Sequence, residues 1–358
     1  MKKLILGLTL LFLLTGTAFA EDMTGIDTDG LTEELPNEVL EILPEFSNQE
    51  PVNFWESLKS MLLESLTREK SSFRSGLGLC AVLLGLVTLC SVAEISADKN
   101  NSGAITIAGA LGITAAILGT FQSMIVLASD TVKSMTEYSA CLLPIMASAS
   151  VMGGAVSSGT ALYSGTVLFT QMLMQLITRL LIPGVYFYLC VSMAEAALPG
   201  ETLSEIREFV GWVISKSLRL ILFIFVAYMT ITGVISGTAD VTAQKAAKAA
   251  LSGMVPVVGG MISDASESLV ASAAMLKSSV GVFGMLAILG MVLLPFLKVG
   301  IHYLLLKITA AVSGTVGLKP HVSLLKHFTE AMGYLLAMCG TCAMLLLISL
   351  VCFVRVVV

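Results

Sequence analysis

Long apolar runs recur along the chain, separated by short stretches that carry charged residues, glycine or proline. A helix needs about 20 predominantly apolar residues to cross the hydrocarbon core of a bilayer. Seven runs come close enough to this length to predict an all-α fold, a polytopic bundle of transmembrane helices. They cover residues 77–92, 104–129, 160–177, 180–198, 210–237, 280–306 and 331–354.

A further apolar segment, residues 139–155, contains Pro144 and many small side chains. Three placements are open for it, because it can cross the bilayer, enter and return on the same side, or lie along the interface. The expected number of spans is therefore seven or eight, within a membrane domain of residues 73–358.

Residues 1–20 have the order of a secretory signal peptide. Two lysines precede an apolar run at residues 4–14, and a triplet of Ala, Phe and Ala ends at Ala20. The run is too short to span a bilayer comfortably, so we expect cleavage after Ala20, with an uncleaved anchor as the alternative.

Residues 21–72 form an acidic segment that we expect outside the cytoplasm. From Glu21 to Lys70 there are 13 acidic residues against three basic ones. Apolar residues from Phe54 to Leu66 recur at helical spacing, which predicts a short amphipathic helix. Such a helix suits either the membrane surface or a partner protein.

The composition agrees with a membrane protein. Apolar residues make up 56% of the chain and charged residues only 13%, and the mean hydropathy is +0.91. Water-soluble domains have about twice this charged fraction. The membrane domain is weakly basic and has no basic stripe that would neutralise phosphates, so nucleic-acid binding is not expected. The seven cysteines lie in apolar stretches, which argues against a disulfide scaffold.

The distribution of lysine and arginine predicts the orientation, because short loops rich in them stay in the cytoplasm. The most basic loop lies between Lys307 and Lys326, which leaves the carboxyl terminus outside. Lys216 and Arg219 favour a cytoplasmic entry into the 210–237 span. An odd number of crossings must then separate the acidic head, residues 21–72, from residue 210. Counting the Pro144 segment as a crossing satisfies this requirement.

Prolines suggest an internal repeat of residues 104–200 in residues 216–312. Pro144 and Pro183 match Pro256 and Pro295 at a constant offset of 112 residues. Proline removes a backbone donor, and a freed backbone group inside a bilayer must be buried in protein or face a watery cavity. Pro-broken or re-entrant helices at matching places in two halves indicate a pathway or binding site, with kinking and packing alone as the alternative.

Several charged residues lie at or near membrane depth. Lys298 stands within an apolar run, and Asp264 and Glu267 share a helical face. This face either lines an aqueous path or belongs to a solvated surface helix. The candidate pore or hinge residues are Pro144, Pro183, Pro256, Gly259, Gly260, Asp264, Glu267 and Lys298.

Catalytic patterns are absent from the sequence. There is no nucleophile elbow, phosphate-binding loop or zinc-protease helix, and the chain has only three histidines. We therefore expect a protein that is not an enzyme, with no catalytic, metal or cofactor site.

The stretch Pro256-Val-Val-Gly-Gly-Met-Ile-Ser-Asp-Ala265, continued by Leu276-Lys-Ser-Ser-Val-Gly281, resembles the stage III sporulation protein AE family. The order of leader, acidic head and polytopic domain agrees with that family. The resemblance extends loosely over residues 76–350 and is sharp at 252–284, whereas residues 21–72 carry no family signature.

The resemblance implies a sporulation role in the mother-cell membrane around the forespore. The family is thought to contribute to a channel between the two cells, together with ring-forming proteins, a secretion-type ATPase and a forespore membrane partner. It supplies no catalytic residues to transfer, and it leaves the transported material open.

We expect a membrane subunit of such a channel or export complex. The alternatives are a self-contained secondary transporter and a scaffold that anchors other members of the complex. Any span can face the lipid bilayer or a sister copy, so a homo-oligomer stays open.

Overall fold

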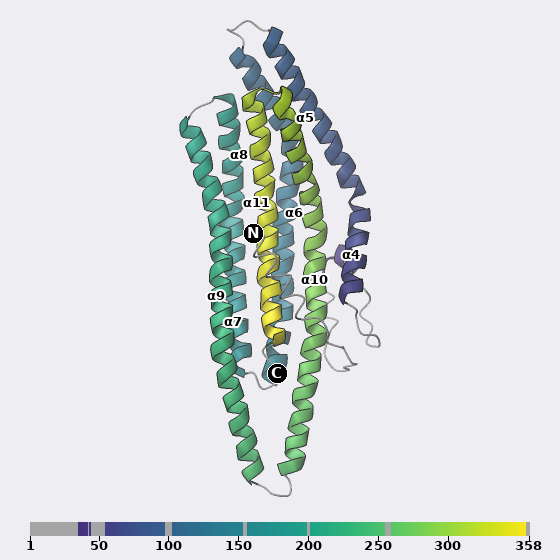
Figure 1. Cartoon of the computed structure of the whole chain (residues 1–358), viewed down its shortest axis with the longest axis vertical. Coiled ribbons are helices and arrows are strands. Elements are labelled where there is room, and N and C mark those ends of the chain that lie inside the picture. The colour runs from purple at the N-terminus through teal and green to yellow at the C-terminus, as the bar shows by residue number, and fades with distance from the viewer. Residues whose placement is uncertain are drawn as a thin grey trace.

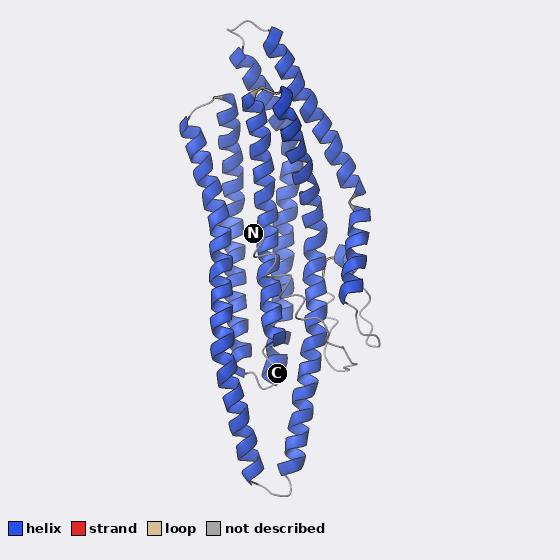
Figure 2. Ribbon diagram, in the orientation of Figure 1, coloured by secondary structure: helices blue, strands red, loops and turns tan. Residues whose placement is uncertain are grey.

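The computed structural model describes residues 35–41, 43, 54–96, 102–152, 156–198, 201–254 and 259–355, with the side chains of residues 102, 152, 156, 158, 233–279 and 355 outside this description. Every regular element in these ranges is a helix (Figure 2). The helices are α3 (Asn37–Leu40), α4 (Phe54–Arg68), α5 (Lys70–Ser96), α6 (Ser102–Met152), α7 (Val156–Leu176), η1 (Ile177–Leu181), α8 (Ile182–Ala197), α9 (Glu201–Met254), α10 (Gly259–Val316) and α11 (Lys319–Arg355).

The long helices run side by side along the long axis of the molecule and alternate in direction (Figure 1). Helix α11 lies in the middle and contacts α6, α7, α8, α9 and α10. Helix α9 packs against α7 and α8 on one side of it, and α5 packs against α6 and α10 on the other. The expected all-α helical bundle is confirmed.

Helix α11 is central because apolar residues cover most of its circumference. A helix that is apolar on nearly all sides is stable only when neighbouring elements cover it. Phe328 packs edge-to-face on Phe121 of α6 at 5.9 Å, and the Ser349 hydroxyl accepts a hydrogen bond from Thr166 of α7 at 3.0 Å. The fully buried residues of α11 include Leu324, Leu325, Phe328, Ala331, Met332, Leu335 and Phe353.

Six helices in the described part are long and apolar enough to cross a membrane, rather than the seven or eight expected. Two predicted spans, 160–177 and 180–198, form one continuous helical rod of α7, η1 and α8. The rod contains a π-turn in which the N–H of Ile182 donates to the carbonyl of Ile177. Pro183 follows this turn directly, and the wider π-helical turn accommodates a proline ring that would crowd an ordinary one.

The segment around Pro144 makes no crossing or re-entrant turn of its own. Helix α6 stays continuous through Pro144, whose side chain is exposed on the helix surface. Pro295 likewise lies inside α10. The six candidate spans are Lys70–Ser96, Gly103–Val151, Gly159–Ala197, Glu201–Thr232, Val280–Val316 and Lys319–Val354.

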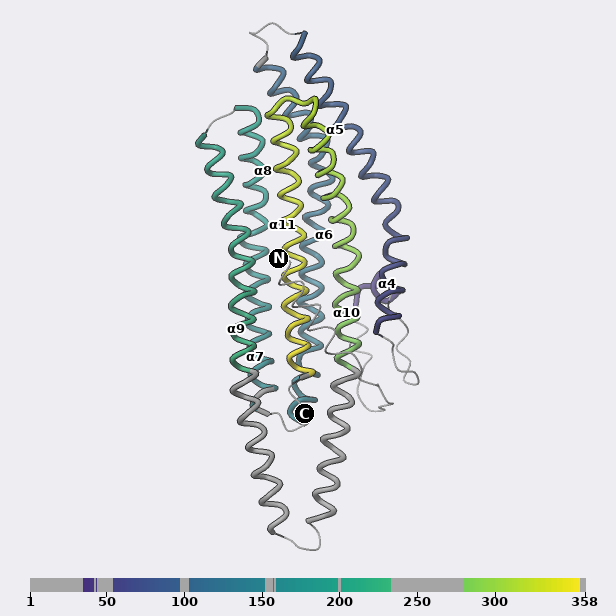
Figure 3. The backbone as a smooth tube through the Cα atoms, viewed as in Figure 1, coloured from purple at the N-terminus to yellow at the C-terminus, as the bar shows by residue number. Residues whose placement is uncertain are grey.

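Although the candidate spans are fewer than expected, the number between the acidic segment and residue 210 is still odd, as predicted. The head and residue 210 are separated by α5, α6 and the α7–α8 rod, which makes three crossings instead of five. Helices α5, α8 and α10 end at the end of the bundle where α6, α9 and α11 begin (Figures 1 and 3). The basic residues between Lys307 and Lys326 lie at this end, which we call the basic end.

The acidic head contains the expected amphipathic helix, α4, and it packs along α10. A Cβ added to Gly290 of α10 would lie 3.0 Å from Met61 and 2.9 Å from Val39 of α3. Arg68 pairs with Glu41 at 2.8 Å and with Glu64 at 3.0 Å, and these hydrogen bonds raise its pKa. The predicted signal peptide lies outside the described residues.

The contact between α7 and α9 supplies a test of this packing. A Cβ at Gly165 would overlap the ring of Tyr228, which is held because its hydroxyl donates to the carbonyl of Ala161 at 3.1 Å. Gly165→Ala should therefore lower the free energy of unfolding by about 1–3 kcal/mol, measured by thermal unfolding in detergent. Gly119→Ala is the matched control, because Gly119 is exposed on α6 with nothing within 4 Å of an added Cβ. An equal loss at both positions would contradict the predicted close contact.

Candidate functional site

Polar side chains gather between α8, α9 and α11, toward the basic end. On α8, Tyr188, Ser192 and Glu195 lie about one helical turn apart and so share one face. The Tyr188 hydroxyl donates a hydrogen bond of 2.5 Å to the Glu330 carboxylate on α11. This bond joins two helices separated by 142 residues, so only the folded bundle creates it.

An ion pair joins the adjacent ends of α8 and α9. The Arg207 guanidinium donates to the Glu195 carboxylate at 2.8 Å, and only 12% and 19% of the two side chains are exposed. A second carboxylate, Glu208, lies 3.4 Å from the same guanidinium but is largely exposed. The shielded Arg207–Glu195 pair therefore joins the two helices, whereas Glu208 is a neighbour of Arg207 on α9 itself.

Two tyrosine rings fill the space between α8, α9 and α11. Tyr188 packs edge-to-face on Tyr334 at 5.4 Å. A Cβ at Gly211 of α9 would lie 2.5 Å from the Tyr334 hydroxyl, so glycine is required for α9 to approach α11 this closely. The buried His327 ring also packs edge-to-face against Tyr188, at 6.2 Å between ring centroids.

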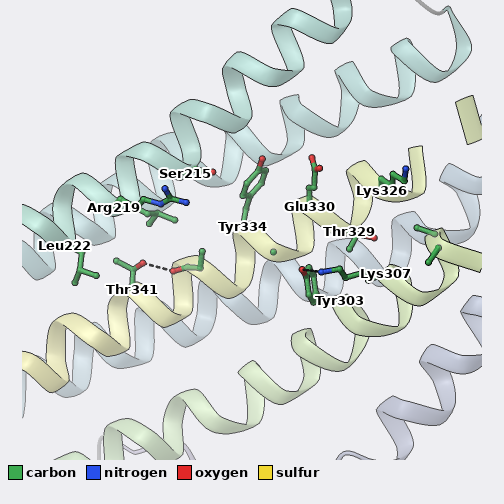
Figure 4. Close-up of a pocket in the computed structure, with 15 residues that line it drawn as sticks. Ser215, Arg219, Leu222, Tyr303, Lys307, Lys326, Thr329, Glu330, Tyr334 and Thr341 are labelled. Carbon is green, nitrogen blue, oxygen red and sulfur yellow. Dashed lines mark hydrogen bonds between the residues drawn. The ribbon is translucent and has the colours of Figure 1, made fainter. Parts of the chain in front are cut away.

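A groove of about 780 Å³ opens beside this cluster, between α9 and α10, and α11 forms its floor (Figure 4). We call it the lateral groove. The floor follows one stripe of α11 at helical spacing, which contains Lys326, Glu330, Gly333, Ala337 and Thr341. Glycine and alanine leave the volume between the flanking helices unfilled, and this is why a groove exists here.

Each helix also contributes charged or polar side chains to the lateral groove. Arg219 lines it from α9, Lys307 from α10, and Lys326 and Glu330 from α11. The Lys307 ammonium lies 5.4 Å over the Tyr303 ring and donates to its hydroxyl at 3.3 Å. Three cations against one carboxylate make the groove positively charged.

The side chains that line the groove indicate what it could bind. No three His, Cys, Asp or Glu side chains among those that the structure describes could together hold a metal ion. Glu330 has a tyrosine rather than a histidine or a second acid as its hydrogen-bond partner. The described groups could therefore neutralise an anion and contact an apolar chain.

Of the residues predicted as pore or hinge positions, the structure describes the side chains of three, Pro144, Pro183 and Lys298, and these do not line the groove. Pro144 and Pro183 are exposed on the surfaces of α6 and α8. Lys298 is half-buried on α10, and its carbonyl lies 2.9 Å from Nδ1 of His302. Pro256 lies outside the described residues, as do the side chains of Asp264 and Glu267, and Gly259 and Gly260 are the first two residues of α10.

The internal repeat stays a prediction. Pro144 lies within α6, and its proposed counterpart, Pro256, lies outside the described residues. The members of the second pair, Pro183 and Pro295, both lie inside continuous helical segments.

The comparisons with known proteins agree with the resemblance seen in the sequence. The model of the family described as stage III sporulation protein AE matches residues 38–356. The chain belongs to this family. The match includes the described helices from Glu38 of α3 to the end of α11, and thus the lateral groove.

A curated relative, stage III sporulation protein AE of Bacillus subtilis (strain 168), is 22% identical over 234 residues. The alignment covers 65% of this chain and 58% of the relative, so the chain spans less than two thirds of the relative's length. No solved structure matches the chain.

The ion pair between α8 and α9 can be tested by a double-mutant cycle. Arg207→Gln leaves the shielded Glu195 carboxylate without this partner, so we expect a loss of about 1–3 kcal/mol in the free energy of unfolding. Adding Glu195→Gln should recover part of that loss. Unfolding in detergent measures both, and Lys216→Gln, an exposed lysine on the same helix, is the control. Strictly additive losses would show that the pair contributes no coupling.

The tyrosine contact with Glu330 gives a second test. Tyr188→Phe retains the ring but removes the hydrogen bond to the carboxylate, and bonds to charged groups contribute about 1.5–3 kcal/mol. We expect a loss of unfolding free energy near the lower end of this range, because Glu330 is partly exposed. Tyr186→Phe, at an exposed position of α8, should change little. Indistinguishable unfolding temperatures for the two variants would argue against the bond.

Proposed function

We propose that the protein is an integral membrane subunit of a sporulation channel or export complex that connects the mother cell and the forespore. Membership of the stage III sporulation protein AE family supports a role in sporulation. Six helices long and apolar enough to cross a membrane support a location in a membrane. The mother-cell membrane around the forespore is the location that we propose.

The observation that carries the proposal is the position of α11. Apolar side chains of α11 occupy the axis of the bundle, where a self-contained transporter would place its pathway. The lateral groove lies to one side of α11 and opens between α9 and α10. A single chain folded in this way fits a role as one component of a conduit better than a role as the whole conduit.

The proposed partners follow from that role. We propose that the chain assembles with ring-forming proteins, a secretion-type ATPase and a forespore membrane partner, or with further copies of itself. Large apolar side chains are exposed on the outer faces of α5 and α9, among them Leu89, Phe209 and Phe223. Such faces suit lipid or the helices of another membrane subunit, because both are apolar.

Two measurements on the full chain test the proposal. The purified protein reconstituted alone in liposomes should show no flux of small solutes above protein-free liposomes, because α11 fills the axis of the bundle. The tagged protein isolated from sporulating cells should retain the secretion-type ATPase and the ring-forming proteins. Solute flux by the chain alone would favour a secondary transporter, and an isolated chain in sporulating cells would contradict membership of a complex.

A further inference from the structure

The three cations of the lateral groove come from three different helices. Arg219, Lys307 and Lys326 are all exposed, and none forms an ion pair with another residue in the described part of the chain. Charged residues in an apolar setting are costly and normally face a partner or water. The convergence of three unpaired cations on one groove therefore indicates an anionic ligand.

The single carboxylate of the groove does not neutralise them. Glu330 accepts its hydrogen bond from Tyr188, on the α8 side of α11. Lys307 is held in place by Tyr303, whose ring and hydroxyl are both within reach of the ammonium group. The Tyr303 hydroxyl accepts from Lys307, so its own hydrogen remains available to an anion.

Small side chains, Gly333 and Ala337, form the middle of the groove floor. Figure 4 shows Lys307, Lys326 and Glu330 toward one end and Arg219, Leu222 and Thr341 toward the other. From Lys326 to Thr341 the floor is about 22 Å long at the rise of an α-helix. One leaflet of a bilayer has about 15 Å of hydrocarbon, so the groove is long enough for a charged headgroup and an acyl chain together.

We propose that the lateral groove binds one anionic phospholipid, whose phosphate lies between Lys307 and Lys326 and whose acyl chain extends past Ala337 toward Thr341. Arg219 lies toward the other end of the groove, beside Leu222 and Thr341. Basic pockets between transmembrane helices on the cytoplasmic side recognise anionic headgroups. The position of the groove near the basic end fits the cytoplasmic leaflet under the positive-inside rule.

The net charge of the ligand distinguishes it from other lipids. Phosphatidylglycerol carries a full negative charge, whereas the choline group of phosphatidylcholine brings a positive charge toward Lys307 and Lys326. The groove should therefore retain phosphatidylglycerol in preference to phosphatidylcholine. A soluble anion lacks the acyl chain and gains nothing from the apolar part of the groove.

Lipid retention by the purified full-length protein tests the proposal. The protein in detergent is supplied with phosphatidylglycerol or phosphatidylcholine, and the lipid that stays bound is measured by native mass spectrometry. A basic residue near anionic lipid contributes about 1 kcal/mol, which is about fivefold in affinity. Lys307→Gln with Lys326→Gln should thus weaken phosphatidylglycerol binding by about 25-fold and leave phosphatidylcholine binding unchanged.

Matched variants separate loss of the site from loss of the fold. Lys307→Arg with Lys326→Arg should retain phosphatidylglycerol, because the positive charge is kept. Lys216→Gln removes an exposed lysine one turn from Arg219 that does not line the groove, and should bind as the unaltered protein does. Equal retention of the two lipids, or equal losses for the groove pair and Lys216→Gln, would overturn the proposal.

Competition distinguishes the source of the phosphate. Millimolar inorganic phosphate should not displace phosphatidylglycerol, since it makes none of the acyl-chain contacts. Displacement by inorganic phosphate would overturn the lipid assignment in favour of a soluble anion. A change in oligomeric state of the glutamine pair with unchanged lipid retention would overturn it in favour of a protein partner.

Discussion

The burial of α11 is the constraint on which the rest of the structure depends. Its apolar residues face α6, α7, α8, α9 and α10, which together span the chain from residue 102 to residue 316. Helix α11 contacts all five of these helices, so it provides their common surface. Close packing at this surface is shown by Phe121 on Phe328 and by the hydrogen bond from Thr166 to Ser349.

Incomplete coverage of α11 creates the lateral groove. Helices α9 and α10 flank the stripe from Lys326 to Thr341 without closing over it, because Gly333 and Ala337 supply little side-chain volume to fill the gap. The polar cluster around Tyr188 then closes the same stripe from the α8 side. The apolar core and the charged groove are therefore two faces of one helix.

Hydropathy alone predicts the helical class and most helix positions, but not where helices join. The runs at 160–177 and 180–198 look separate because Arg179 stands between them and Pro183 lies near the start of the second. Arg179 is nevertheless exposed on a continuous rod. The sequence does not predict the lateral groove, because Arg219, Lys307 and Lys326 are far apart along the chain and only the fold brings them together. The spacing of Lys326, Glu330, Gly333, Ala337 and Thr341 on one side of an apolar helix was the available signal.

The π-turn before Pro183 sets which way α8 faces. A hydrogen bond from residue i+5 encloses one residue more than an α-helical bond, and each residue of an α-helix turns the chain by about 100°. All side chains after Leu181 are thus rotated relative to those of α7 by this extra residue. Through this angular offset, α7 can place Phe169 against Phe225 of α9 while α8 places Tyr188 against α11. The one extra residue of the π-turn therefore determines the direction in which α8 faces, and with it the position of Tyr188 beside the groove.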